Sequence, residues 1–498
     1  MVKNSVVHAL GSAVHACILY RPASDEYHLW YTRKMHLKKN QKRCYMKKLI
    51  CVLLVMVFIL SSCGAADPDN DLHNGGSNGS ISFDDDTNTE IDIKTYPWRS
   101  NVCSISSGLY QCVERWGIPR EDPLYYCIPV NTTYTDYSTL QTVYLCSVPG
   151  CVHNDSSCTS YMEHNVRLVP DYNEEHIILI YAGTTEKDIT SEIQLASVSI
   201  MDLNGSNRKE ILRLKAQEEI DELSDLFIDN HNHMYFVVKR PGRWEIRQLD
   251  LITGVCETLF TSESGLFCRH GYRDNLIIEY WDGPVEELFK CYCVSTGEIT
   301  GNIITPNEYG GCMTSFSHYY MGYNRGNVDD PDITEVDLAV FDYDTGEMVK
   351  LIKGLPCAQG QYPMISMFDK TKFEWTYLYE KPPVNVDANG KSYESGGTTY
   401  YGYIVDLETG TCTENILRYQ YRDSESKPVP VIAETGDGRL VVTTGTSTRW
   451  LTLTDYKGIP HVLQVDDYPE YSLITVEDYC AGRPNYQPIE DKVYIQEG

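Results

Sequence analysis

FDYDTG, residues 341–346, ends an apolar stretch with an acidic residue and closes it with a turn glycine. Asp favours local hydrogen bonds from its side chain to the backbone, and Gly supplies the positive φ of a tight turn. The element recurs as MDLNG ending at Gly205, LDLITG at Gly254, YCVSTG at Gly297, VDLETG at Gly410 and TDYKG at Gly458, with YLCSVPG at Gly150 as a diverged copy. Successive glycines are 43 to 64 residues apart. This spacing is typical of four-stranded propeller blades.

A second element precedes each of these turns, a predicted strand that opens just after a polar turn. Its copies are SGLYQCV (107–113), EEHIILIYAG (174–183), NHMYFVV (232–238), DNLIIEYW (274–281), HYYMGYN (318–324), KFEWTYLYE (372–380) and GRLVVTTG (438–445). Because the two elements alternate, each unit is predicted to hold two hairpins, as a blade requires. We therefore predict an all-β fold, a single β-propeller of about seven four-stranded blades, with six to eight possible, over residues 95–498. A pair of β-sandwiches is the alternative.

The chain ends on DKVYIQEG, residues 491–498, a copy of the strand element with no turn after it. We predict that Lys492 to Gln496 pairs with a strand within residues 95–130, because this contact closes the ring and removes an open sheet edge. The tryptophans near predicted strands are expected in the cores between blades, with a sugar-stacking platform as the rival. They are Trp244, Trp281, Trp375 and Trp450.

The stretch MKKLICVLLVMVFILSSCG, residues 46–64, has the layout of a secretion signal. Two lysines precede a 12-residue apolar run, Leu49 to Leu60. This run is too short for a membrane span, which needs about 20 helical residues. LSSC at 60–63 resembles the lipobox of bacterial lipoproteins, in which the cysteine thiol takes the lipid. We therefore predict a signal peptide over 46–62 and lipidation at Cys63.

The segments around this signal have no pattern of a packed domain. Residues 1–45 are predicted to be a spurious or unstructured extension, because they lack a sustained apolar periodicity. Residues 63–94 are rich in Gly, Ser, Asn and Asp, so they are predicted to form a flexible acidic tether. The lipid on Cys63 would then hold the propeller at the outer face of the cytoplasmic membrane.

Charge narrows the range of partners. The whole chain carries a formal charge of −28, and residues 63–498 alone carry −36. Such a body is repelled by phosphate backbones, so nucleic acid is excluded as an expected partner. We expect a monomer whose contacts are the membrane, through the lipid, and an unidentified protein or glycan.

Cys146, Cys151, His153 and Cys158 form the densest cluster of reactive side chains, with the spacing C-x4-C-x-H-x4-C. Thiolates and an imidazole at this range can surround a tetrahedral zinc ion. Outside the cell the same cysteines can instead form a disulfide, with the third cysteine free or paired to Cys103, Cys112 or Cys127, or they can stay reduced. In each case the cluster is expected to staple a loop, with a structural zinc ion as the one candidate cofactor.

No residue is assigned a catalytic or cofactor-binding role. The body holds no G-x-x-x-x-G-K-[ST], G-x-G-x-x-G or H-E-x-x-H motif. His231 and His233 form an H-x-H pair before a predicted strand, and without a third ligand in view we interpret the pair as part of a polar turn.

The lipobox, the acidic tether, the propeller repeats and the cluster YLCSVPGCVHNDSSCTSY at 144–161 together resemble a family of TolB-like β-propeller lipoproteins of anaerobic Gram-positive bacteria, itself uncharacterised in function. The resemblance covers residues 46–498. It implies a propeller fold and a lipid-anchored place at the cell surface, and it implies no activity.

The sequence favours a binding or interaction module over an enzyme, because the tether lets a rigid propeller sample partners and catalytic motifs are missing. The alternative is a propeller enzyme that acts on glycans or peptides, which carboxylates converging at one channel mouth would favour. A second alternative is a solute-capturing partner of a transporter.

Overall fold

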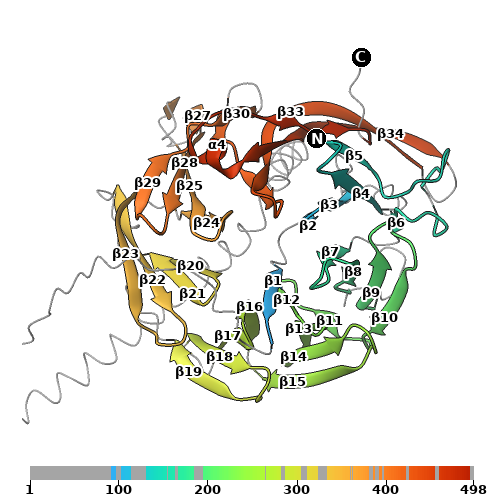
Figure 1. Cartoon of the computed structure of the whole chain (residues 1–498), viewed down its shortest axis with the longest axis horizontal. Helices are drawn as coiled ribbons and strands as arrows, with labels where there is room; N and C mark the ends of the chain where they lie inside the picture. The colour runs from blue at the N-terminus through green and yellow to red at the C-terminus, as the bar shows by residue number, and fades with distance from the viewer. Residues whose placement is uncertain are drawn as a thin grey trace, which may run out of the picture. The chain divides into compact units, whose positions relative to one another are not determined.

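The chain folds into a seven-bladed β-propeller. The computed structural model describes residues 91–96, 102–113, 130–153, 155–162, 166–183, 195–263, 265–281, 287–303, 311–323, 334–358, 361, 363–380, 385–386, 392–394, 398–421, 425–454 and 459–493. In these residues seven antiparallel sheets follow one another around a ring (Figure 1). The predicted fold class is confirmed.

Each blade contains four consecutive main strands. Blade 1 comprises β2 (Val102–Ile105), β3 (Gly108–Val113), β4 (Val130–Asp136) and β5 (Gln141–Tyr144), and blade 2 comprises β7 (Arg167–Pro170), β8 (His176–Tyr181), β9 (Ser197–Asp202) and β10 (Lys209–Arg213). Blade 3 comprises β12 (Leu226–Asp229), β13 (His233–Arg240), β14 (Arg243–Asp250) and β15 (Cys256–Ser262). Blade 4 comprises β16 (Leu266–Tyr272), β17 (Asn275–Trp281), β18 (Glu287–Cys293) and β19 (Ile299–Ile303). Blade 5 comprises β20 (Gly311–Phe316), β21 (Tyr319–Tyr323), β22 (Glu335–Asp342) and β23 (Met348–Pro356). Blade 6 comprises β24 (Met364–Met367), β25 (Lys372–Glu380), β28 (Thr398–Asp406) and β29 (Thr411–Glu414). Blade 7 comprises β32 (Val431–Glu434), β33 (Arg439–Thr454), β34 (Pro460–Thr475) and β35 (Gln487–Pro488).

Short elements decorate these blades. They are β1 (Ile93–Tyr96), β6 (Tyr161–Met162), β11 (Glu219–Ile220), the hairpins β26 (Asn385–Val386) with β27 (Ser392–Glu394) and β30 (Arg418–Tyr421) with β31 (Glu425–Pro428), helix α4 (Val476–Cys480) and β36 (Glu490–Asp491). β1 pairs antiparallel with β12, so the described chain begins against blade 3 before it forms blade 1. Among the described residues, no helix has both the length and the apolar character that crossing a membrane requires.

The predicted strand openings all begin the second strand of a blade, namely β3, β8, β13, β17, β21, β25 and β33. These strands are covered by a neighbouring blade on each face, so they are apolar on both faces. In β13, for example, every residue from Met234 to Val238 is buried.

The predicted acidic turn joins the third and fourth strands in blades 2 to 6. Asp342 shows why it recurs: its Oδ1 accepts the backbone N–H groups of Asp344 and Thr345, both at 2.8 Å. Gly346, at a φ of 71°, then donates its N–H to the carbonyl of Asp342 at 2.9 Å. The glycine is needed because this φ lies in the left-handed region.

Two of the predicted copies are corrected by the structure. In blade 1 the third-to-fourth turn is Asp136 to Leu140, and YLCSVPG starts at the last residue of β5 and continues past it. Leu140 takes the glycine position, with a φ of 58° and its N–H donated to Asp136. TDYKG lies between the second and third strands of blade 7, and its residues 455–458 fall outside the described part. Helix α4 takes the place of the acidic turn there.

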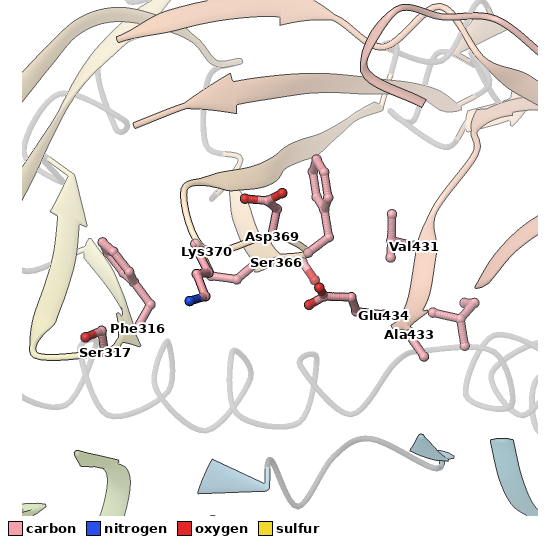
Figure 2. Close-up of a pocket in the computed structure, with 11 residues that line it drawn as sticks. Phe316, Ser317, Ser366, Asp369, Lys370, Val431, Ala433 and Glu434 are labelled. Carbon is pink, nitrogen blue, oxygen red and sulfur yellow. The ribbon is translucent and has the colours of Figure 1, made fainter. Parts of the chain in front are cut away.

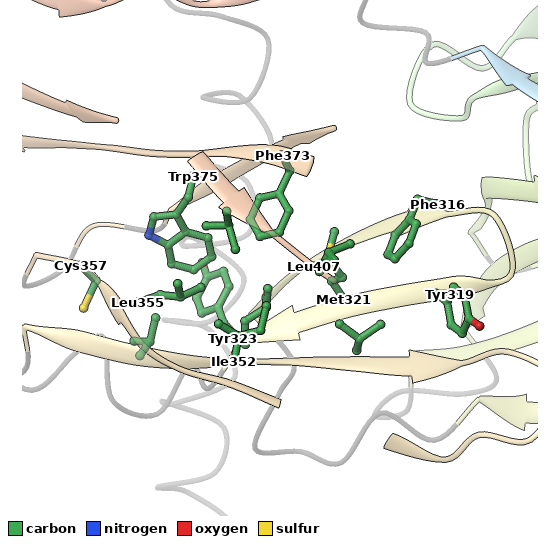
Figure 3. Close-up of a cluster of buried hydrophobic side chains, with 14 of the residues drawn as sticks. Phe316, Tyr319, Met321, Tyr323, Ile352, Leu355, Cys357, Phe373, Trp375 and Leu407 are labelled. Carbon is green, nitrogen blue, oxygen red and sulfur yellow. The ribbon is translucent and has the colours of Figure 1, made fainter. Parts of the chain in front are cut away.

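The hydrophobic core is divided into clusters, one between each pair of adjacent blades. Between blades 5 and 6, Trp375 is fully buried and donates its indole N–H to the carbonyl of Pro356 at 2.7 Å (Figure 3). This tryptophan therefore has the predicted core role. Trp244 packs against the core between blades 3 and 4, whereas Trp450 is half-buried and in none of these clusters. The side chain of Trp281 is outside the described part.

Blade 7 meets blade 1 at the seam, which we define as residues 487–493 together with β5. Gln487 and Pro488 pair with β34, and Glu490 and Asp491 then pair parallel with Gln141 and Thr142 of β5. One short segment thus joins the last blade to the first, as ring closure requires. The predicted details are corrected: pairing begins at Glu490 and not Lys492, and its partner β5 lies outside residues 95–130. Residues 494–498 lie outside the described part.

Candidate functional site

The predicted cysteine and histidine cluster forms on a loop of blade 1. We call residues 145–160 the cluster loop; it leaves β5 and returns to β6, which pairs with the other end of β4. One ligand atom from each of Cys146, Cys151, His153 and Cys158 lies within 4.8 Å of the others. Residues far apart on an extended chain are therefore gathered around one point.

Backbone geometry brings this cluster together. Gly150 has a φ of 74° and His153 a φ of 53°, so two residues of the loop adopt left-handed backbone conformations. A left-handed histidine is uncommon and costs backbone energy, which surrounding contacts must offset. The His153 ring supplies two of them: it lies 4.2 Å from the Tyr144 ring, and its Nδ1 is 3.1 Å from the Cys158 Sγ.

Burial and hydrogen bonding shift the pKa values of Cys146 and Cys158 in opposite directions. Burial raises the pKa of Cys146, but hydrogen bonds from the Val148 backbone and from the other two thiols outweigh it and lower that pKa overall. Burial, followed by interaction with the neighbouring thiols, raises the pKa of Cys158 to about 12. Burial lowers the pKa of His153, which favours its neutral form. The Cys146 thiol therefore loses its proton more readily than an ordinary thiol, and the Cys158 thiol less readily.

The cluster cysteines are thiols in the structure, and so are Cys103 and Cys112. Cys103 is buried, and the Cys112 thiol donates to the carbonyl of Val166 at 3.3 Å. Cys127 lies outside the described part.

Two other predicted sites have different outcomes. Cys63 lies outside the described residues, so lipidation stays a prediction. His233 bonds through Nδ1 to the buried carboxylate of Asp229 at 3.0 Å, and the same carboxylate accepts the backbone N–H of His231. This is the polar turn expected for the H-x-H pair. Within the described residues, the only group of metal-binding side chains is the cluster on blade 1.

A pocket that the sequence did not indicate lies on the inner strands of blades 5 to 7. Its volume is about 310 Å³. The turn after β20, the strand β24 with its following turn, and β32 supply its walls (Figure 2). These residues come from three blades and are separated by more than a hundred positions, and no local motif connects them. What these residues share is their position on, or directly after, the first strand of a blade.

The pocket combines apolar surface with charge. Phe316 and Phe368 supply aromatic rings, while Asp369, Lys370 and Glu434 supply charged groups. Loss of hydration raises the pKa of Glu434, repulsion from Asp369 raises it further, and Lys370 opposes both. An apolar wall with a few convergent polar groups is the usual composition of a ligand pocket.

A buried carboxylate braces the wall of this pocket. Glu374 of β25 is 5% exposed, and its Oε2 accepts the backbone N–H of the pocket residue Val431 at 3.3 Å. Its Oε1 is 2.5 Å from the hydroxyl of Tyr479, which belongs to α4. Burial raises the pKa of Glu374 to about 7, although these hydrogen bonds oppose the rise. Blades 6 and 7 are thus joined through one carboxylate.

Comparison with protein-family models and with curated proteins gives no match. Solved structures are similar to this chain at low identity. An oligogalacturonate lyase of Vibrio parahaemolyticus is 13% identical over 77% of this chain and 95% of its own, with a TM-score of 0.39. The β-propeller domain of the Trilobed protease of Pyrococcus furiosus is 12% identical over 63% and 79%, with a TM-score of 0.34. TolB of Acinetobacter baumannii is 11% identical over 76% and 81%, with a TM-score of 0.30. These likenesses concern the fold alone.

Proposed function

We propose that this protein is a lipid-anchored binding module, held at the outer face of the cytoplasmic membrane through Cys63, with its ligand site in the pocket between blades 5 and 7. LSSC at 60–63 and the acidic tether support the anchoring. The observation that carries the binding role is the pocket itself, where aromatic side chains and three charged groups converge.

The pocket selects for ligand size and charge. At about 310 Å³ it lies at the small end of ligand pockets, so it suits one side chain of a protein or one sugar unit of a glycan. Its two carboxylates outnumber its single ammonium group, and residues 63–498 carry a net charge of −36. A neutral or cationic group is therefore the better fit, because an anion would meet repulsion from the whole body.

Capture from a cell-wall extract tests the binding role. The anchored protein in detergent is the bait, and mass spectrometry of bound proteins and glycans is the readout. Glu434→Gln and Lys370→Ala change the pocket, whereas Lys209→Ala changes an exposed lysine on the outer strand of blade 2 and is the matched control. We expect Glu434→Gln to lose a species that the wild type and the control retain, and Lys370→Ala, which removes a positive charge from the pocket, to retain it as well. Equal capture by all four proteins would contradict the proposed site.

An enzyme that cleaves glycans or peptides is the second candidate, and one observation favours it. Glu434 shares the pocket with a second carboxylate, Asp369, and its pKa is raised, which is the usual condition for a general acid. If this candidate is correct, the captured species is turned over by the wild type, and Glu434→Gln binds it without turnover. A species that is bound and released unchanged by the wild type favours the binding module.

A further inference from the structure

The cluster on blade 1 has the dimensions of a tetrahedral metal site. Zinc bonds to thiolate sulfur at about 2.3 Å, which sets neighbouring ligands in a tetrahedron about 3.8 Å apart. The four ligand atoms here lie within 4.8 Å of one another, and the Nδ1–Sγ pair of His153 and Cys158 is already at 3.1 Å. Small side-chain rotations are enough to place all four around one ion.

We propose that Cys146, Cys151, His153 and Cys158 bind one Zn²⁺, and that this ion fastens the seam that closes the propeller ring. Three soft thiolates with one imidazole are a donor set that selects zinc over magnesium or calcium, which prefer oxygen. Binding requires each thiol to lose its proton to solvent, and the resulting zinc, three-thiolate and neutral-imidazole site carries a charge of −1. No oxidant or reductant takes part.

The position of the cluster connects the metal to the seam. Cys146 lies two residues beyond Tyr144, the last residue of β5, and the Tyr144 ring lies 4.2 Å from the ring of the ligand His153 at a tilt of 32°. β5 is the strand that receives the C-terminal segment: Glu490 donates its N–H to Leu140 at 2.8 Å, and Lys492 donates to Thr142 at 2.9 Å. Anything that orders the end of β5 therefore orders the surface on which the seam forms.

The middle of the cluster loop is exposed, whereas its two ends are held together: the Thr159 hydroxyl donates to the carbonyl of Leu145, which itself donates its N–H to Thr132. Residues 147–150 and 155–157 are exposed, and Val148 and Val152 are more than 60% exposed. The opposite end of the loop is held by Arg208, whose guanidinium donates to the carbonyls of Thr159 and Tyr161. A zinc ion would join the exposed middle of the loop to the end that Arg208 holds. Cys158 is the ligand nearest to that end.

Blades 7 and 1 are joined by fewer buried apolar side chains than blades 5 and 6 and by a short strand, so an added metal link would stabilise their contact. The buried apolar cluster between blades 7 and 1 contains only Leu109, Tyr137, Val441 and Leu473 among the described residues, whereas the cluster between blades 5 and 6 has fifteen buried members. The strand that crosses the seam, β36, has two residues. Local stability is lowest where buried apolar contacts are few, so the ring is expected to open first here.

Metal analysis of the full chain tests the ligands. The protein is purified in detergent under reducing conditions, exposed to zinc, desalted and assayed for bound metal. We expect one zinc per chain in the wild type, loss of that zinc in Cys151→Ser, and retention in His153→Cys, which keeps four ligands. Cys256→Ser, which removes a half-buried thiol on outer strand β15, is the matched control and should also retain it. Cobalt in place of zinc should give the visible absorption of a tetrahedral thiolate site.

Trypsin cleavage after Lys492 tests the role at the seam, with cleavage at the exposed Lys209 as the internal reference. We expect a chelator to raise the rate after Lys492 several-fold in the wild type and to leave the already fast rate of Cys151→Ser unchanged. Absence of stoichiometric zinc, or a disulfide among the cluster cysteines in the protein isolated without reductant, would overturn the metal site. Bound zinc with no effect on cleavage after Lys492 would overturn the link to the seam.

Discussion

The hydrogen bonds around Glu374 favour a protonated carboxyl group in the folded protein below its pKa of about 7. The hydroxyl of Tyr479 has a single proton, yet it has two acceptors nearby, Glu374 Oε1 at 2.5 Å and the carbonyl of Val429 at 2.6 Å. A third partner, the Asn415 amide, donates to the hydroxyl at 2.9 Å. All groups are satisfied if Glu374 donates to Tyr479 and Tyr479 donates to Val429. An ionised Glu374 would instead accept the hydrogen bond of the Tyr479 hydroxyl, and the hydrogen bond from that hydroxyl to the Val429 carbonyl would be weakened.

The pKa of Glu374 converts this geometry into a pH dependence. It lies at about 7 in the folded protein against an ordinary value of 4.5. Between these two values the folded chain keeps a proton that the unfolded chain has lost, so the free energy of unfolding falls as pH rises from about 4.5 to about 7, and levels above that. A shift of this size corresponds to a loss on the order of 3 kcal/mol.

Glu374→Gln should remove this loss. An amide nitrogen can donate to Tyr479 as the protonated acid does, and the amide oxygen can still accept from Val431. We expect the variant to match the wild type near pH 5 and to exceed its free energy of unfolding by about 3 kcal/mol at pH 8. Glu374→Ala should be less stable than Glu374→Gln at every pH, because it leaves a cavity and buried polar groups without partners.

Urea unfolding at pH 5, 6, 7 and 8 provides the measurement, with tryptophan fluorescence as the signal. Glu347→Gln, at an exposed turn of blade 5, is the matched control and should follow the wild type throughout. The difference between wild type and Glu374→Gln is the decisive quantity, because other titrating groups cancel in it. A difference that stays constant from pH 5 to pH 8 would refute the assignment of a proton to Glu374.

Three further predictions test the anchor, the seam and the core. Cys63→Ala should leave the protein unprocessed or release it from membranes, as read by membrane fractionation; a variant that matures normally and stays bound would contradict lipidation. Deletion of 490–498 removes the backbone hydrogen bonds from Glu490 to Leu140 and from Lys492 to Thr142, worth about 1 kcal/mol each, and the buried side chain of Val493, worth about 2 kcal/mol. The thermal midpoint should fall, and an unchanged midpoint would show that the seam does not hold the ring. Trp375→Ala should cost about 3–5 kcal/mol in urea unfolding, whereas the half-buried Trp450→Ala should cost much less; equal costs would contradict the core role of Trp375.

The sequence predicts the propeller because the same local physics repeats in most blades. An apolar second strand must be covered on both faces, and an Asp-to-Gly turn satisfies its own backbone groups, so both leave a periodic signal. The signal fails where different residues achieve the same geometry. Leu140 adopts the left-handed φ of a turn glycine, and α4 replaces the turn altogether in blade 7. A turn pattern that requires glycine therefore finds neither the turn at Leu140 nor the helix α4.

Candidate sites are predictable to the extent that their residues are neighbours in sequence. Cys146, Cys151, His153 and Cys158 are adjacent enough for their spacing alone to indicate a cluster, and the structure brings them together. The pocket draws Phe316, Asp369 and Glu434 from three blades, and only the closed ring places them side by side. Such a site has no sequence motif, because each residue is ordinary within its own blade.

The last blade connects the pocket to the seam. Glu434 lines the pocket with its side chain, while its backbone carbonyl accepts a hydrogen bond from Ser104 of blade 1 at 2.8 Å. Ser104 in turn lies 2.8 Å from the hydroxyl of Tyr137, a member of the buried cluster at the seam. β32 is therefore held on one side by Glu374 of blade 6 and on the other by blade 1. Separation of blades 7 and 1 would remove the second of these supports, so the shape of the pocket depends on a contact between residues more than 300 positions apart in the sequence.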